Sequence, residues 1–192
     1  MPLVKEFEDG LTRCGWLSLD PVYIDYHDQE WGVEVRGDRE MFERITLEGF
    51  QAGLSWLSIL KRREGFRQAF HNFEPDRVAQ MTADDVERLM LDAGIIRNRA
   101  KILSTIANAQ LVLDMQARGE SISDLVWSFK PKASTRSADN FTWLAVTDDS
   151  KALSKELRLR GFGFVGPTTM HALMQATGMV QDHAPGCFRR EP

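Results

Sequence analysis

The stretch LMLDAGIIRNRAK, residues 89–101, places a short glycine-containing turn between two helical patterns. Upstream of it, Thr82 is followed by a cluster of acidic residues, which suit the positive end of a helix dipole. We expect that first helix to end at Gly94. Downstream, apolar residues recur at helical spacing from about Arg97 to Arg118. The sequence therefore predicts two helices joined by a tight turn.

Three basic residues, Arg97, Arg99 and Lys101, occupy the first turns of the second helix. Positive charge at that end opposes the helix dipole, which makes sense if an anion binds there. Backbone N–H groups around Gly94 could then hold a phosphate. The alternative interpretation is an ordinary solvated basic face.

The rest of the chain is also mostly helical in pattern, and its β signals are short and scattered. Asp38 and Ser55 are the expected N-caps of two of the helices. Helices are predicted at about 38–49, 55–65, 150–160 and from 167 onward, with a loop at 130–149. We expect an all-α fold in a single domain, residues 1–192. It has room for two lobes, a central one with residues 82–118 and one formed by the two terminal segments.

Composition is ordinary for a compact globular domain, with 43% hydrophobic and 27% charged residues in a chain of 192. No apolar run approaches the roughly 18 residues of a membrane span, and the first ten residues lack the apolar core of a secretory signal. With two cysteines and no signal, a cytoplasmic location is expected. The net charge of −4 means that a nucleic acid would have to meet a local basic surface.

Glu48 falls on the apolar stripe of the helix predicted at 38–49. At about 100° per residue it shares a narrow arc with Met41 and Ile45, where an ionised carboxylate without a partner is costly. One interpretation is a structural glutamate paired with an arginine of another helix, and the other is a functional carboxylate. The following stretch, GFQAGLSW at 49–56, suggests a helix break with backbone open to close approach.

Aromatic residues accompany this carboxylate. Trp56 ends the glycine-containing stretch, and four more aromatic residues cluster near the N-terminus: Trp16, Tyr23, Tyr26 and Trp31. Aromatic residues are most often core, but tyrosine and tryptophan also carry polar groups and can line a pocket. A pocket of such rings with one carboxylate suits a flat, cationic or hydrogen-bonding ligand.

The two cysteines, Cys14 and Cys187, lie at opposite ends of the chain, and each has a histidine nearby. With His27 and His183 they make a full tetrahedral set for zinc, with no coordination position left for a reactive water. Such a site would be structural and would fasten the two ends of the chain together. The alternative is two buried thiols and two incidental histidines, because the spacing matches no standard zinc finger.

Six segments in order resemble a known family over nearly the whole chain. They are RCGW (13–16), YHDQEWGV (26–33), LEGFQAGLSW (47–56), DAGII (92–96), GFGFVGPTT (161–169) and QATGMVQDH (175–183). The chain resembles the 3-methyladenine DNA glycosylase I family, a zinc-containing branch of the helix-hairpin-helix DNA glycosylases. It departs from some members at Phe50 and at His171, and the latter could alter the wall of the pocket.

The resemblance implies roles for the residues singled out above. Glu48 would read the damaged base, and Tyr26 and Trp56 would stack on it. The further base-binding candidates are Trp16, Tyr23 and Trp31. The resemblance also implies that Zn²⁺ is bound, one ion per chain, by four ligands: Cys14, His27, His183 and Cys187.

The same resemblance assigns residues 89–101 to a hairpin that grips the phosphate backbone of DNA. Its candidate contacts are Gly94, Arg97, Arg99 and Lys101. The loop from Gln51 to Leu54, with Gly53 at its turn, would fill the gap that the extruded base leaves in the duplex.

The implied activity is that of a monofunctional DNA glycosylase, a hydrolase of N-glycosyl bonds that removes 3-methyladenine from alkylated double-stranded DNA by base flipping in base excision repair. We further expect a monomer with no membrane partner. The alternative is a non-catalytic, zinc-stabilised DNA-binding module. A metal hydrolase or deaminase is disfavoured because four protein ligands leave no reactive water and the deaminase pattern of His-x-Glu with Cys-x-x-Cys is absent.

Overall fold

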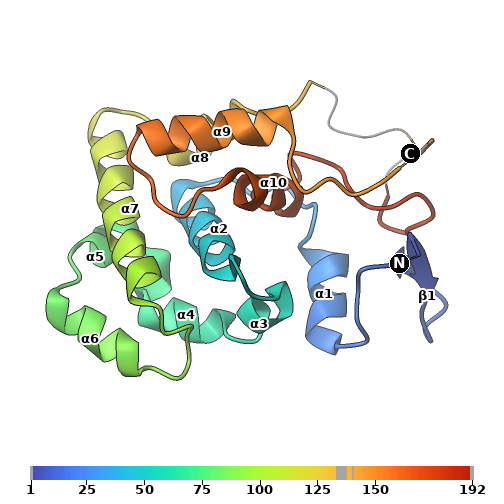
Figure 1. Cartoon of the computed structure of the whole chain (residues 1–192), viewed down its shortest axis with the longest axis horizontal. Coiled ribbons are helices and arrows are strands. Elements are labelled where there is room, and N and C mark those ends of the chain that lie inside the picture. Colours follow the sequence, from blue (N-terminus) through green and yellow to red (C-terminus); the bar gives the residue numbers. More distant parts are fainter. Residues whose placement is uncertain (1, 133–137, 140, 191–192) are drawn as a thin grey trace.

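The computed structural model describes residues 2–132, 138–139 and 141–190 and shows a mostly helical chain (Figure 1). The N-terminal elements are β1 (Val4–Glu6), β2 (Thr12–Cys14), α1 (Pro21–Gln29), α2 (Asp38–Gln51), α3 (Trp56–Leu60), α4 (Arg63–Ala69) and a 3-10 turn, η1 (His71–Phe73). The later ones are α5 (Pro75–Ala79), α6 (Ala83–Leu91), α7 (Arg99–Ala117), α8 (Ile122–Trp127), α9 (Asp148–Leu159) and α10 (Pro167–Ala176). The helical prediction is confirmed, and the antiparallel pair β1–β2 is an addition to it.

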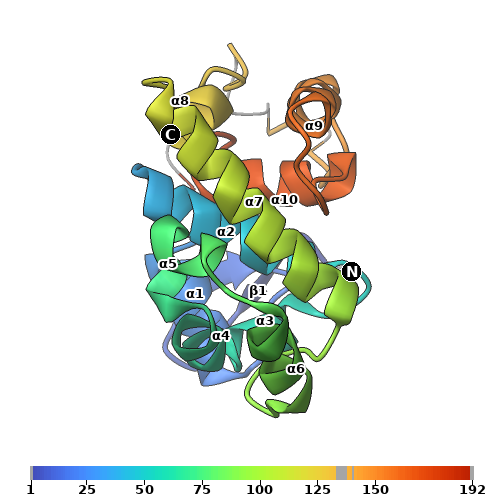
Figure 2. The ribbon, with the colours of Figure 1, turned by 90° about the vertical axis from the view of Figure 1, so that its left-hand side faces the viewer.

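Helix α2 lies at the centre of the molecule, with α7 on one side and α9 and α10 above it in Figure 1. It contacts α3, α7, α8 and α10, so nearly all of its faces are covered. Its apolar side chains Met41, Phe42, Ile45, Leu47 and Phe50 are all buried in one continuous core. The view along the molecule in Figure 2 shows α7 crossing in front of α2. The helix that carries Glu48 is therefore fixed from several directions.

The predicted turn between α6 and α7 is present, and its helix starts are capped by side chains. Thr82 and Asp85 form a reciprocal capping box at the start of α6, as the acidic cluster suggested. The side chain of Asn98 accepts a hydrogen bond from the backbone N–H of Lys101. Helix α7 therefore begins at Arg99, and Arg97 belongs to the turn rather than to the helix.

The helix predicted at 55–65 is wrong in its length. Ser55 does cap it, but α3 ends at Leu60, and a separate helix, α4, begins at Arg63. The break presses the backbone of Gly65 against the α6–α7 turn, where a Cβ on Gly65 would lie 2.4 Å from the carbonyl oxygen of Gly94. Only a glycine allows that close approach, so α4 packs directly against the turn.

The prediction that Asp38 is the N-cap of α2 is wrong. Gly37 occupies the cap position, and Asp38 is the first residue of the helix. The carboxylate of Asp38 instead accepts hydrogen bonds from the hydroxyl of Ser121 at 2.6 Å and from the backbone N–H of Ser123 at 3.1 Å. These bonds join the start of α2 to the start of α8.

The two terminal segments lie side by side at one end of the molecule (Figure 1). The backbone N–H of Phe188 donates to the carbonyl oxygen of Thr12 at 2.9 Å, and that of Gly15 donates to Leu3 at 2.8 Å. The predicted loop at 130–149 has no helix or strand in its described residues before Asp148, and residues 133–137 and 140 lie outside the described part. No described helix combines the length and apolar character needed to cross a membrane.

Candidate functional site

A cavity of about 340 Å³ opens between α1, the C-terminal end of α2, the start of α3 and α10. Its size is at the lower end of small-molecule sites. Side chains from five separate segments line it: Trp16, Tyr23, Tyr26, Trp31, Glu48, Gln51, Trp56, Trp143, Leu144, Ala172 and Gln175. The structure thus brings together all five predicted aromatic residues and the predicted carboxylate.

Among the described residues, Glu48 is the single acidic side chain in the wall of this cavity, and it is only 3% exposed. No hydrogen bond or ion pair joins its carboxylate to any other residue that the structure describes. Arg44, one turn earlier on α2, is paired with Glu30 at 3.0 Å. Burial raises the pKa of Glu48 to about 8, against a weaker lowering effect of Arg44. The structural interpretation, a glutamate paired with an arginine of another helix, is therefore wrong.

The aromatic walls stand on two sides of the carboxylate. Tyr26 and Trp56 have ring centroids 5.5 Å apart with their planes tilted by 54°, so they form an angled pair rather than a closed stack. Trp16 contacts Tyr23 at 5.2 Å and Trp31 at 5.1 Å. Burial, followed by the nearby Glu48, raises the pKa of Tyr23 to about 12, so its hydroxyl stays neutral. These walls are rigid and uncharged.

Four cavity residues were missed by the sequence analysis: Trp143, Leu144, Ala172 and Gln175. Gln175 donates from Nε2 to a carboxylate oxygen of Asp182 at 2.7 Å, and the indole N–H of Trp143 donates to the carbonyl oxygen of Asp182 at 3.1 Å. Trp143 and Leu144 lie in a loop without periodicity, so no pattern could place them. Gln175 could have been noticed as a polar residue directly after the inward-facing Met174. His171 is buried and does not line the cavity.

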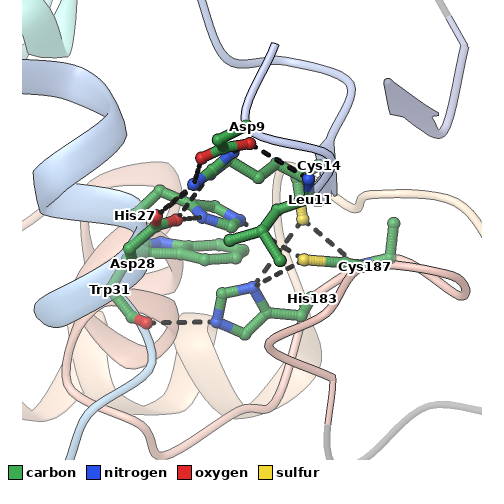
Figure 3. Close-up of polar contacts among 10 residues, drawn as sticks. Asp9, Leu11, Cys14, His27, Asp28, Trp31, His183 and Cys187 are labelled. Atoms are coloured by element: carbon green, nitrogen blue, oxygen red, sulfur yellow. Dashed lines mark hydrogen bonds and ion pairs between the residues drawn. The ribbon is translucent and has the colours of Figure 1, made fainter. Parts of the chain in front are cut away.

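A second cluster, adjacent to the cavity, consists of Cys14, His27, His183 and Cys187, all buried (Figure 3). Their ligand atoms all lie within 4.8 Å of one another. The sulfur of Cys187 is 3.5 Å from Nε2 of His27 and 3.6 Å from Nδ1 of His183, which lies 3.8 Å from the sulfur of Cys14. Tetrahedral zinc bonds of about 2.3 Å to sulfur and about 2.0 Å to nitrogen give S···N edges of about 3.5 Å. The four side chains can therefore hold a metal ion.

Surrounding groups orient both imidazoles for this task (Figure 3). Nδ1 of His27 contacts Asp28 at 2.7 Å, which leaves Nε2 facing the cluster. Nε2 of His183 donates to the carbonyl oxygen of Trp31 at 3.2 Å, which leaves Nδ1 facing it. Asp28 is in turn held by the buried Arg13 at 2.7 Å. Because Trp31 also lines the cavity, the cluster fixes one of the cavity walls.

The α6–α7 turn exposes Gly94, Arg97 and Arg99 to solvent. Arg99 makes two hydrogen bonds of 2.7 Å to the exposed Glu87, while Arg97 has no ion-pair partner among the described residues. Lys101 is different: its ammonium is buried and donates to the carbonyl oxygens of Phe50 and Ala52, both at 2.8 Å.

The prediction that Lys101 belongs to an exposed basic face is wrong. Its side chain runs inward from the first turn of α7 because the last carbonyl groups of α2 have no helical partner and need a donor. A cation at this end also suits the dipole of α2. Lys101 thus joins the α6–α7 turn to the end of the helix that carries Glu48.

The loop after α2 is a tight surface turn. Leu54 donates its backbone N–H to the carbonyl oxygen of Gln51 at 2.7 Å, and the side chain of Gln51 donates back to the carbonyl oxygen of Leu54 at 2.7 Å. Gly53 adopts a φ of +85°, which favours glycine. Leu54 is partly exposed, and Gln51 reaches the cavity, so the loop stands at its rim.

Comparison with known proteins agrees with this geometry. The family model described as "Methyladenine glycosylase" matches residues 16–190. The chain belongs to the methyladenine glycosylase family. The DNA-3-methyladenine glycosylase 1 of Escherichia coli (strain K12) is 51% identical over 180 residues, which cover 92% of this chain and 96% of that protein.

Solved structures of family members have the same fold. A crystal structure of 3-methyladenine DNA glycosylase I superposes with a TM-score of 0.88 at 49% identity, covering 93% of this chain and all of the other. A variant of a 3-methyladenine DNA glycosylase I in complex with 3-methyladenine gives a TM-score of 0.81 at 38% identity, covering 91% of this chain and 95% of the other. The methyladenine glycosylase fold is thus shared over nearly the whole chain.

The burial of Glu48 makes a prediction about stability. A folded-state pKa of about 8 lies above the unfolded value of about 4.3, so the folded protein retains a proton that the unfolded chain loses. The stability that this proton contributes is full below about pH 4.3 and is lost as the pH rises to about 8. Glu48→Gln removes the titration, and we expect it to raise the free energy of unfolding by on the order of 5 kcal/mol at pH 8.

Denaturant unfolding of both proteins from pH 4.5 to 8.5 measures this difference, which should grow with pH and level off near pH 8. Glu43→Gln is the matched control on the same helix. Glu43 is ion-paired with Arg67 at 2.8 Å, so its replacement should lower stability instead. A Glu48→Gln gain that does not vary with pH would show that Glu48 is ionised in the folded protein.

Proposed function

We propose that this chain is a monofunctional DNA glycosylase that hydrolyses the N-glycosidic bond of 3-methyladenine in alkylated double-stranded DNA, acting on a base flipped into the aromatic cavity. The observation that carries the proposal is Glu48, a carboxylate buried without a partner among flat rings. Membership of the methyladenine glycosylase family and the relative in complex with 3-methyladenine support it.

The cavity would select the damaged base by charge. Adenine that is methylated at N3 in DNA is a cation, whereas intact adenine is neutral. Without ligand, a pKa of about 8 keeps Glu48 largely protonated near pH 7. A cationic ring next to the side chain would release that proton, because an opposite charge favours the ionised carboxylate. The carboxylate could then accept a hydrogen bond from the amino group on the base edge, with Tyr26 and Trp56 against the ring faces.

The same carboxylate would assist bond cleavage. As the glycosidic bond breaks, the base leaves as a neutral molecule and the positive charge moves to the sugar. Only a contact that strengthens in the transition state speeds the reaction, so Glu48 would act mainly by stabilising the charge on the sugar. Water would then attack the anomeric carbon and lose a proton to bulk solvent, which leaves a hydroxyl group on the abasic sugar. Lys101 is engaged by two carbonyl groups, and no lysine lines the cavity in the part of the chain that the structure describes. We therefore propose hydrolysis without a covalent lysine intermediate and without strand cleavage.

We propose that α6 and α7 form a helix-hairpin-helix unit that binds the DNA backbone. Gly94 would offer its backbone, and Arg97 and Arg99 their charges, to phosphates on either side of the lesion. The Gln51–Leu54 loop at the cavity rim would fill the gap left by the extruded base. Lys101 is not part of this contact.

We also propose that the ion in the Cys14, His27, His183 and Cys187 cluster is Zn²⁺. Two sulfur and two nitrogen donors in a tetrahedral set match its preferences. Bound zinc would supply a cross-link between chain ends that are 173 residues apart in sequence, and four protein ligands exclude a catalytic water there. A cytoplasmic location and a monomeric state stay predictions from the sequence.

The alternative of a non-catalytic DNA-binding module requires the aromatic residues to fill a core. The cavity of about 340 Å³ between them argues against that reading. Binding of DNA without release of a free base would favour the alternative.

The first experiment is chromatographic identification of the bases released from methylated duplex DNA. We expect the wild-type protein to release 3-methyladenine and to leave the strands uncut. Glu48→Gln should slow the release at least about tenfold, which corresponds to about 1.4 kcal/mol of barrier. Arg118→Ala, at the far end of α7, is the control and should keep the wild-type rate. Wild-type release by Glu48→Gln would contradict the role of this residue.

The zinc proposal predicts about one zinc per chain by elemental analysis of the purified protein. Cys14→Ser should lose the metal, and its free energy of unfolding should fall by at least about 3 kcal/mol, as for loss of a long-range cross-link. Zinc added to the variant should restore little of this stability, while zinc added to chelator-treated wild-type protein should restore it fully. A folded wild-type protein without metal, and indifferent to added zinc, would contradict the proposal.

The proposed role of Arg97 leads to a separate prediction about the salt dependence of DNA binding. If it neutralises one phosphate, Arg97→Ala should weaken duplex binding and reduce the slope of log K against log salt by about 1. Arg118→Ala, at the opposite end of α7, should leave the slope unchanged. Equal slopes for the wild type and Arg97→Ala would place the phosphate contacts elsewhere on the surface.

A further inference from the structure

The stretch GFGFVG, residues 161–166, connects α9 to α10 and contains a backbone outlier that the proposed function leaves unexplained. Phe164 adopts a φ of +56°, in the left-handed region that a bulky side chain rarely occupies. The residue is also 41% exposed. Glycines stand on both sides of it, at 163 and 166, yet phenylalanine occupies the strained position. A strained, exposed aromatic residue calls for a function.

Phe164 is held firmly in this conformation. The side chain of Asn108 on α7 brackets the preceding residue: its Oδ1 accepts from the N–H of Gly163 at 2.9 Å, and its Nδ2 donates to the carbonyl oxygen of Gly163 at 3.2 Å. On α2, a Cβ on Gly49 would lie 3.2 Å from the Cβ of Phe164, so the two backbones are in close contact. The connection thus lies against both α2 and α7 (Figure 1).

The ring lies beside the elements that the proposed function assigns to DNA. The ammonium of Lys101 is 5.8 Å from the centroid of the Phe164 ring, and the same ammonium holds the carbonyl oxygens of Phe50 and Ala52. Ala52 belongs to the loop at the cavity rim, and Lys101 to the first turn of α7. Phe164 therefore lies beside the end of α2 and the first turn of α7. Gly49, which it contacts, directly follows Glu48 on α2.

We propose that Phe164 is a DNA-contacting residue that packs its ring against the sugar and base of a nucleotide flanking the extruded one. This rests on the proposed function, because it places the duplex across the loop and the turn. An aromatic ring held rigidly at the surface can bury itself against a base or a sugar without losing side-chain freedom, and such contacts do not depend on sequence.

Phe164→Gly tests the proposal, because glycine adopts a φ of +56° without strain. We expect the melting temperature to stay the same or to rise, while the dissociation constant for a duplex with a stable abasic-site analogue increases about tenfold. The salt slope should not change, since no charge is removed. Binding of free 3-methyladenine should also be unchanged, because Phe164 does not line the cavity. Phe164→Trp should keep the wild-type duplex affinity.

Leu159→Ala is the matched control, because it removes another exposed apolar side chain, near the end of α9, and should leave duplex affinity unchanged. Wild-type duplex affinity in Phe164→Gly would overturn the inference, and so would a lower melting temperature, which would indicate a structural role. A change of sedimentation with intact duplex affinity would also overturn it, in favour of contact between copies of the chain. If the wild type bound duplex DNA but released no base, the proposed function would fail while the Phe164 contact could still be observed.

Discussion

The structure depends on one constraint: a carboxylate is kept away from water without a partner. Glu48 is nearly fully buried among aromatic rings, and desolvation raises its pKa to about 8. The same desolvation that disfavours its charge would make its attraction to a cationic ring strong, because Coulomb interactions grow as the local dielectric falls. A neutral base offers no such compensation. Under the proposed function, selectivity for a charged base would therefore follow from the environment of Glu48 rather than from the number of its contacts.

Such a side chain stays buried only if its helix cannot shift, and charges at both ends of α2 hold it. At the start, Asp38 accepts bonds from Ser121 and Ser123, and at the end Lys101 donates to Phe50 and Ala52. Both charges have the sign that the helix dipole favours. The Cys/His cluster holds the opposite wall of the cavity in place, because His183 donates a hydrogen bond to the carbonyl oxygen of Trp31. Two supports that are distant in sequence thus converge on one small cavity.

The sequence predicted the parts of this arrangement that depend on local pattern. Helical periodicity placed Glu48 on a buried face, and residue chemistry selected the Cys/His set and the aromatic cluster. Prediction from the sequence failed where tertiary contacts determine the position of a side chain or the end of a helix. Lys101 has the spacing of a solvated basic residue, and only the unpaired carbonyl groups of α2 turn it inward. Trp143 and Gln175 reach the cavity through loop and helix packing that no periodicity encodes. The break between α3 and α4 follows from the approach of Gly65 to Gly94, which is also invisible in sequence.

The inward turn of Lys101 changes how an acidic protein would hold a polyanion. Of the three basic residues at the start of α7, one is buried and one is paired with Glu87, so Arg97 alone keeps an uncompensated exposed charge. Counterion release at this turn would therefore contribute little to affinity, and the net charge of −4 would work against it at long range. Grip on the duplex must then come from contacts that do not scale with charge. Under the proposed function, backbone N–H groups at the Gly94 turn and apolar groups such as Leu54 would be of that kind, and they would act at short range, close to the lesion.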